Sequence, residues 1–147
     1  MIIRLKYHTL LLIASSVLFF FPSKMFSQTI IINKTNPVEK ISKSMLRNIF
    51  LGNNVSWENG RRIQIVDFIS DSPLRKQFDK NTLMLSPQKV SMIWVKVSLS
   101  GKSIPPKIVH AEEDVKNFIN ENEGGIGYIK NVTNLPQSVK IIQVTEE

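Results

Sequence analysis

The chain has 147 residues, a formal net charge of +7 and a hydrophobic fraction of 42%. It contains no cysteine, which excludes disulfide bonds, thiol catalysis and a lipid-modified cysteine. The basic excess is modest and forms no block of like charge, so nucleic acid is not an expected partner. The length suits one globular domain.

The first 27 residues have the pattern of a secretory signal peptide. Arg4 and Lys6 precede an apolar run over residues 10–21, which is short for a membrane span, and the small residue Ser27 follows. We predict cleavage after Ser27 and export to the periplasm, with free secretion as the alternative location and an uncleaved anchor as the alternative interpretation. Residues 28–147 then form one domain with a net charge of +4, because three basic residues and no acidic ones precede it.

The apolar pattern next predicts a strand and a helix. Residues 29–32 form a β-branched run that suits a strand buried on both faces, as in a parallel sheet. Apolar residues recur at helical spacing over residues 41–50, which predicts a helix. Ser42 is placed to cap the start of this helix, and Gly52 is placed just after its end.

A tryptophan, Trp57, lies in the polar connection that follows this helix. The turn dipeptide Asn59-Gly60 leads from the connection into a predicted buried strand over residues 63–68. Trp57 is either a platform for a partner or ligand, or a plug that covers the end of a small core. We favour the plug, because the indole N–H then needs only one loop carbonyl as its partner.

Two Ser-Pro pairs, Ser72-Pro73 and Ser86-Pro87, predict two helix starts. Serine is a good N-cap, and proline is tolerated at the first helical position. The second helix places four apolar residues on one stripe, although its β-branched residues also permit a strand. These four are Val90, Ile93, Trp94 and Val97.

The last part of the chain predicts one more helix and two strands. Acidic residues crowd the first turn of a helix that begins near Glu112, where they complement the helix dipole. Short strands are predicted over residues 126–129 and 139–144, with the last strand at a sheet edge. Helices and strands alternate through most of the chain, which predicts an α/β class with a mixed sheet flanked by helices.

The inventory of reactive side chains argues against an enzyme. His110 is the only histidine after residue 27, and the chain lacks cysteine, so the common zinc and copper ligand sets are missing. The sequence has no Gly-x-Ser-x-Gly elbow, no phosphate-binding glycine loop and no spacing that singles out two carboxylates as an acid/base pair. We therefore predict a non-catalytic protein without a metal or cofactor.

Residues 69–75 have the features of a candidate anion site. They connect a predicted strand to a helix N-terminus, where free N–H groups and the helix dipole favour negative charge. Ser70 and Ser72 would add hydroxyl donors, and Arg75 would add a charged fork. The alternative is an ordinary helix cap by Ser72. A proline without an N–H and a nearby aspartate also count against an anion.

Three motifs occur in a characteristic order. They are Asn-Pro-Val at residues 36–38, Ile-Phe-x-Gly followed by Trp and Gly within residues 49–60, and Gly-Ile-Gly-Tyr at residues 125–128. Together they resemble the phosphate-binding-protein family of ABC transporters, and most closely its short, single-lobe relatives. The resemblance spans residues 30–129 and implies one α/β lobe of the type 2 periplasmic binding fold.

The resemblance also implies where phosphate is bound in the full-length family. An arginine after the strand and a Ser-Gly-Thr at the helix N-terminus grip the ligand there. This chain has Asp67 at the arginine position and Ser72-Pro73-Leu74 in place of Ser-Gly-Thr, so only Ser72 matches. Arg75 is a candidate replacement for the lost charge.

The resemblance therefore implies a periplasmic protein that binds phosphate or another small anion through Ser70, Ser72 and Arg75. The first alternative is an interaction module that docks on an envelope protein, such as a sensor kinase or a porin, without binding solute. The second alternative is a structural secreted domain.

Overall fold

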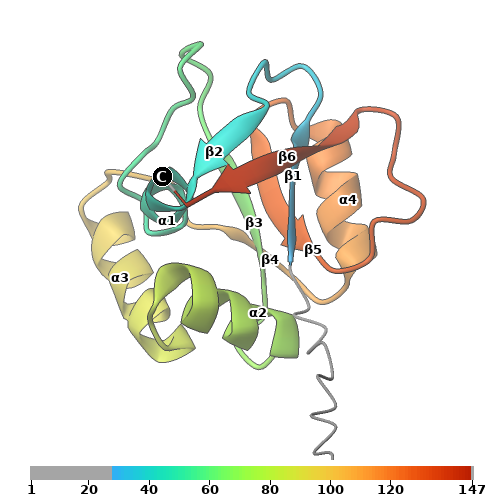
Figure 1. Ribbon diagram of the computed structural model, residues 1–147. Helices are drawn as coiled ribbons and strands as arrows, with labels where there is room; N and C mark the ends of the chain where they lie inside the picture. Colours follow the sequence, from blue (N-terminus) through green and yellow to red (C-terminus); the bar gives the residue numbers. More distant parts are fainter. Residues whose placement is uncertain (1–27, 147) are drawn as a thin grey trace, which may run out of the picture.

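The computed structural model describes residues 28–146, and the predicted signal peptide lies outside these residues. The strands are β1 (Thr29–Asn33), β2 (Lys40–Ser42), β3 (Gln64–Phe68), β4 (Lys107–Val109), β5 (Gly125–Ile129) and β6 (Val139–Thr145). The helices are α1 (Lys43–Phe50), α2 (Pro73–Phe78), the π-helical turn η1 (Asp79–Leu83), α3 (Pro87–Leu99) and α4 (Glu112–Glu121) (Figure 1).

The strands form one mixed sheet in the order β2-β6-β1-β5-β3-β4. β1 is antiparallel to both of its neighbours, β5 and β6, whereas β3 is parallel to β4 and β5, and β2 is parallel to β6. β1 therefore runs in the opposite direction to the other five strands. The C-terminal ends of β2–β6 and the start of β1 share one edge of the sheet, which we name the carboxyl edge.

The sequence predicted the fold class correctly but misplaced two strands. The α/β class with a mixed sheet flanked by helices is confirmed. β1 is buried as expected, but its pairing is antiparallel on both sides rather than parallel. β6 was predicted at an edge, which is wrong, because it lies between β2 and β1. β2 and β4 supply the two edges, and the sequence pattern predicted neither.

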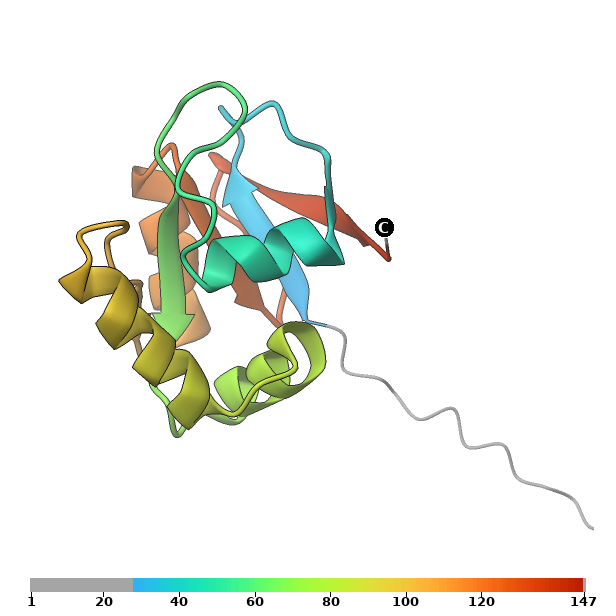
Figure 2. The same ribbon diagram turned by 90° about the vertical axis from the view of Figure 1, so that its left-hand side faces the viewer.

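Helices cover both faces of the sheet. In Figure 1, α4 lies on one side of the sheet and α1 and α3 on the other, with α2 near the carboxyl edge. Figure 2 shows the same arrangement from the side of α1 and α3. β5 contacts helices on both faces of the sheet. Gly127 faces Val115 of α4, whereas the next residue, Tyr128, stacks on Phe78 of α2. No helix within residues 28–146 has the length and apolar character needed to cross a bilayer.

Local capping signals were predicted well for two helices. Ser42 accepts a hydrogen bond from the N–H of Met45, and Ser86 accepts one from the N–H of Lys89. Ser72 occupies the N-cap position of α2, but its side chain makes no capping hydrogen bond. Gly52 has the positive φ of +73° that favours glycine after a helix, as the sequence predicted.

Trp57 is a plug of the core. Only 3% of its surface is exposed, and its Nε1 donates to the carbonyl oxygen of Gly124 at 3.0 Å. A Cβ atom on Gly124 would collide with the carbonyl of Arg62, so the close approach requires glycine. The plug interpretation is confirmed, and the connection that carries Trp57 is thereby fixed to the start of β5.

Candidate functional site

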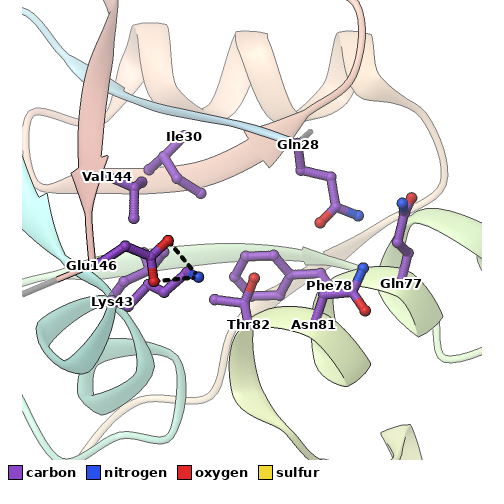
Figure 3. A pocket seen from close by; sticks show the side chains of 10 residues that line it. Gln28, Ile30, Lys43, Gln77, Phe78, Asn81, Thr82, Val144 and Glu146 are labelled. Carbon is purple, nitrogen blue, oxygen red and sulfur yellow. Dashed lines mark hydrogen bonds and ion pairs between the residues drawn. The ribbon is translucent and has the colours of Figure 1, made fainter. Parts of the chain in front are cut away.

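A cavity of about 310 Å³ lies at the carboxyl edge. Four separate segments enclose it: the start of β1, the start of α1, the α2–η1 unit and the end of β6. Figure 3 shows amide and hydroxyl groups directed into the same space, with an ion pair at one end. Its polar lining residues are Gln28, Lys43, Gln77, Asn81, Thr82 and Glu146.

The ion pair in this cavity joins Lys43 and Glu146. The Nζ of Lys43 lies 2.8 Å from each carboxylate oxygen of Glu146. Both side chains are well exposed, at 47% and 83%, so solvent screens the pair and its net attraction is weak. The Glu146 carboxylate therefore holds the charge of Lys43 only weakly.

The cavity is attached to the segment that the sequence singled out. Nε2 of Gln28 donates to the carbonyl of Leu74 at 2.7 Å, which links the start of β1 to the first turn of α2. Ser70 and Ser72 lie just before this turn, with Ser70 exposed and Ser72 half-buried. The structure thus places both serines at the carboxyl edge, next to an element that lines the cavity.

The guanidinium group of Arg75 does not lie where a ligand-binding group was expected. Arg75 is only 4% exposed. Its Nη1 lies 3.0 Å from Oδ2 of Asp67 and 2.8 Å from the carbonyl of Phe68, and its Nε lies 3.3 Å from Oδ2 of Asp79. The expectation that Arg75 offers a free charge beside Ser70 and Ser72 is corrected, because two buried carboxylates already balance that charge.

Asp67 is the centre of this buried network. Its Oδ1 accepts a 2.6 Å hydrogen bond from the hydroxyl of Tyr128 and a 2.8 Å bond from the N–H of Phe68. Burial raises the pKa of Asp67, while the attraction of Arg75 and these hydrogen bonds act in the opposite direction. The position where the resemblance expects a phosphate-gripping arginine thus holds a carboxylate that is itself bound by an arginine.

Asp79 is the less satisfied member of the network. It is fully buried, and its Oδ1 has no hydrogen-bond partner within residues 28–146. Burial raises the pKa of Asp79 to about 6, with the attraction of Arg75 lowering it and the repulsion of Asp67 raising it further. Burial and the Asp67 charge also raise the pKa of Tyr128, so its hydroxyl stays protonated and remains a donor.

Sequence reasoning missed both the network and the cavity. Arg75 and Asp79 are four residues apart, which is ion-pair spacing on a helix and was an available signal for that contact. Asp67 and Tyr128 come from β3 and β5, and their proximity depends on strand pairing. The cavity joins residues more than one hundred positions apart, such as Lys43 and Glu146, so no local pattern marks it.

The chemistry available at the carboxyl edge is that of binding. Neutral amides, a hydroxyl and the Lys43–Glu146 ion pair line the cavity. Among the residues that the structure describes, no group of three or more His, Asp or Glu side chains is arranged to hold a metal ion. The arrangement suits a small polar or anionic solute held by hydrogen bonds and a single charge.

Parts of several solved structures share this fold, and two of these structures are described as phosphate-transport proteins. An ABC-type phosphate transport receptor from Vibrio cholerae has a TM-score of 0.60 and 22% identity over 80% of this chain. A phosphate ABC transporter substrate-binding protein from Clostridium perfringens, solved with bound phosphate, has a TM-score of 0.64 and 20% identity over 81%. PstS from Borrelia burgdorferi has a TM-score of 0.61 and 15% identity over 81%.

This likeness confirms the predicted resemblance at the level of the fold. The match covers 45% to 47% of these three chains, so the present chain spans less than half of their length. No protein-family model matches the sequence, and no curated protein matches it. The six-stranded mixed sheet of residues 28–146 corresponds to a lobe of these phosphate-binding proteins.

Proposed function

We propose that the protein is an exported, non-catalytic binding protein that holds a small oxyanion, such as phosphate, at the carboxyl edge of its sheet. The observation that carries this proposal is the cavity of about 310 Å³ with Lys43 at its wall. In open α/β sheets, ligands bind outside the carboxyl ends of the strands. The shared fold with phosphate receptors supports the same ligand class.

The size and polarity of the cavity favour a small solute. Its volume is close to the lower limit of about 300 Å³ for ligand pockets. Gln28, Asn81 and Thr82 offer neutral hydrogen-bonding groups, and Lys43 offers the positive charge. A single exposed lysine that already has a carboxylate partner gives weak binding, with a dissociation constant on the order of 1 mM.

Ser70 and Ser72 extend the proposed site. They lie at the same edge, and neither side chain is used as a cap of α2. Their hydroxyl groups would donate to the outer oxygens of an anion held at the cavity. Arg75 stays within the buried network in this proposal and supports the site by fixing the α2–η1 unit to β3.

Titration calorimetry with phosphate, sulfate and acetate tests the site. Lys43→Gln is expected to weaken binding of the preferred anion about tenfold, since a hydrogen bond to a charged group is lost. Glu146→Gln is expected to strengthen binding, because it removes the carboxylate that competes for Lys43. Ser70→Ala with Ser72→Ala is expected to weaken binding by a smaller factor, since neutral hydrogen bonds are lost.

Lys34→Gln is the matched control, because Lys34 is exposed and lies after the end of β1, away from the carboxyl edge. It makes the same change of charge and is expected to leave the affinity unchanged. No heat with any of the three anions at millimolar concentration would contradict the proposed function. An equal loss in Lys34→Gln and Lys43→Gln would show a general charge effect and would contradict the cavity as the site.

A further inference from the structure

The outer side of α3 carries an exposed apolar stripe, which is unusual for a helix on a protein surface. Val90 and Trp94 face the core, with Ile93 and Val97 packed beside them, as the sequence predicted. A second set of apolar residues lies on the opposite side at helical spacing, i, i+3 and i+7. These are Met92, Val95 and Leu99, with exposed fractions of 62%, 59% and 84%.

Two neighbouring depressions extend this apolar surface. One is lined by Val95 and Leu99 of α3 and Ile108 of β4. The other is lined by Met84 and three lysines, which are Lys76 of α2, Lys80 of η1 and Lys89 of α3. We define the α3 face as Met84, Met92, Val95, Leu99 and Ile108 together with Lys80, Lys89 and Lys96. It contains five of the nine large hydrophobic side chains that are exposed within residues 28–146. In Figures 1 and 2, no other element covers the outer side of α3.

The charge around this surface has one sign. The sequence between residues 80 and 111 has five lysines and no acidic residue. Lys89 and Lys96 are spaced by seven residues, each three positions before Met92 and Leu99 respectively, so they flank the apolar stripe. Neither depression has an acidic lining residue. The nearest acidic residue before this stretch, Asp79, is fully buried.

We infer that the α3 face docks on an anionic lipid bilayer. Apolar side chains in the centre would enter the boundary between headgroups and acyl chains, and the flanking lysines would contact lipid phosphates while their alkyl stems stay in the apolar layer. Each lysine near such a surface contributes about fivefold to affinity. The inference is independent of the proposed anion site, because no residue of the α3 face lines the cavity.

The composition of the face favours lipid over other occupants. Protein interfaces are enriched in tyrosine, tryptophan and arginine and depleted in lysine, whereas the cations of the α3 face are all lysines. A second copy of the chain would bring two positive faces together, which is unfavourable. Pairing through the edge strand β4 is hindered because Pro105 and Pro106, which have no N–H, directly precede it.

Vesicle co-sedimentation tests the inference. The full chain is compared with the chain from Gln28 onward, which retains every described strand and helix. This comparison distinguishes binding by residues 1–27 from binding by the rest of the chain. Vesicles of phosphatidylcholine alone and of phosphatidylcholine with phosphatidylglycerol are used. We expect the shorter chain to bind only the anionic vesicles, with an affinity that falls steeply as salt is added.

Two double variants separate the electrostatic part of the interaction from the apolar part. Lys89→Gln with Lys96→Gln is expected to weaken binding about thirtyfold, and Lys34→Gln with Lys40→Gln, exposed lysines outside the face, is the charge-matched control. Met92→Ser with Leu99→Ser is expected to weaken binding at least about tenfold without changing the salt dependence. Equal losses in the two lysine pairs, or no loss in the serine variant, would overturn the inference.

A site-specific probe gives a second measurement that does not depend on affinity. The chain has no cysteine, so Met92→Cys accepts a single environment-sensitive dye, and Lys34→Cys is the labelled control. A blue shift with anionic vesicles at position 92 alone supports the inference. Three results would overturn it: no shift at position 92, a dimer in sedimentation velocity that Leu99→Ser abolishes, and binding to polyglutamate but not to vesicles.

Discussion

Arg75 shows how the surroundings decide the role of a charged residue. It lies two residues into a helix that begins at Pro73, and a sequence pattern places it beside two serines at a helix N-terminus. The fold instead encloses it between Asp67 and Asp79. Removing a buried arginine that pairs with two carboxylates leaves uncompensated negative charge in the interior. This costs far more stability than losing a surface ion pair.

We therefore predict that Arg75→Met lowers the free energy of unfolding by about 4 kcal/mol. Urea denaturation followed by circular dichroism measures this loss. Lys76→Met makes the same substitution at an exposed neighbour and is expected to change stability by less than about 0.5 kcal/mol. If both variants are equally stable, Arg75 does not have the structural role assigned to it.

Single residues were predictable where their partners are near in sequence. Ser42 and Ser86 cap their helices, and Gly52 adopts positive φ, because these signals depend on the adjacent few residues. The plug role of Trp57 was predictable from its need for one carbonyl, but its partner, Gly124, was not. The contacts of Arg75 were missed because burial by distant strands has no local signature.

At the scale of the element, the periodicity revealed most strands and helices but not their order. The β-branched run of β1 is buried on both faces, and such a run arises whether its neighbours are parallel or antiparallel. β6 has only two buried residues, Val139 and Ile142, as an edge strand would, yet β2 pairs with it. β2 and β4 have three residues each, which is too short to leave a period.

The contact between β5 and α4 gives a prediction at this scale. A Cβ atom on Gly127 would lie 2.7 Å from Cγ1 of Val66 and 2.7 Å from Cγ1 of Val115. Gly127→Ala is therefore expected to lower the free energy of unfolding by about 1–3 kcal/mol through overpacking. The double variant with Val115→Ala relieves one of the two clashes and is expected to cost less than the sum of the single changes in urea denaturation. Additive losses would contradict the overpacking explanation.

At the scale of the whole molecule, charge is segregated. Lysines without acidic neighbours occupy the stretch around α3, acidic residues gather at the start of α4, and two carboxylates are enclosed in the core with one arginine. The buried Asp67–Arg75–Asp79 cluster therefore contains one more negative than positive group when both carboxylates are ionised. This excess makes the stability of the entire fold depend on pH in a direction opposite to the usual behaviour of paired carboxylates.

The last prediction concerns this pH dependence. Burial raises the pKa of Asp79 from 3.8 to about 6, so the folded protein binds more protons than the unfolded chain between these two values. The free energy of unfolding therefore falls as the pH rises through this window. Between pH about 4 and about 6, the free energy of unfolding of the unsubstituted parent protein is expected to fall by about 2 kcal/mol relative to that of Asp79→Asn. Urea denaturation at each pH measures this difference. Asp71→Asn, at an exposed position, is the control and is expected to follow the parent. A parent that gains stability over this interval relative to Asp79→Asn would show that the Arg75 attraction outweighs burial at Asp79.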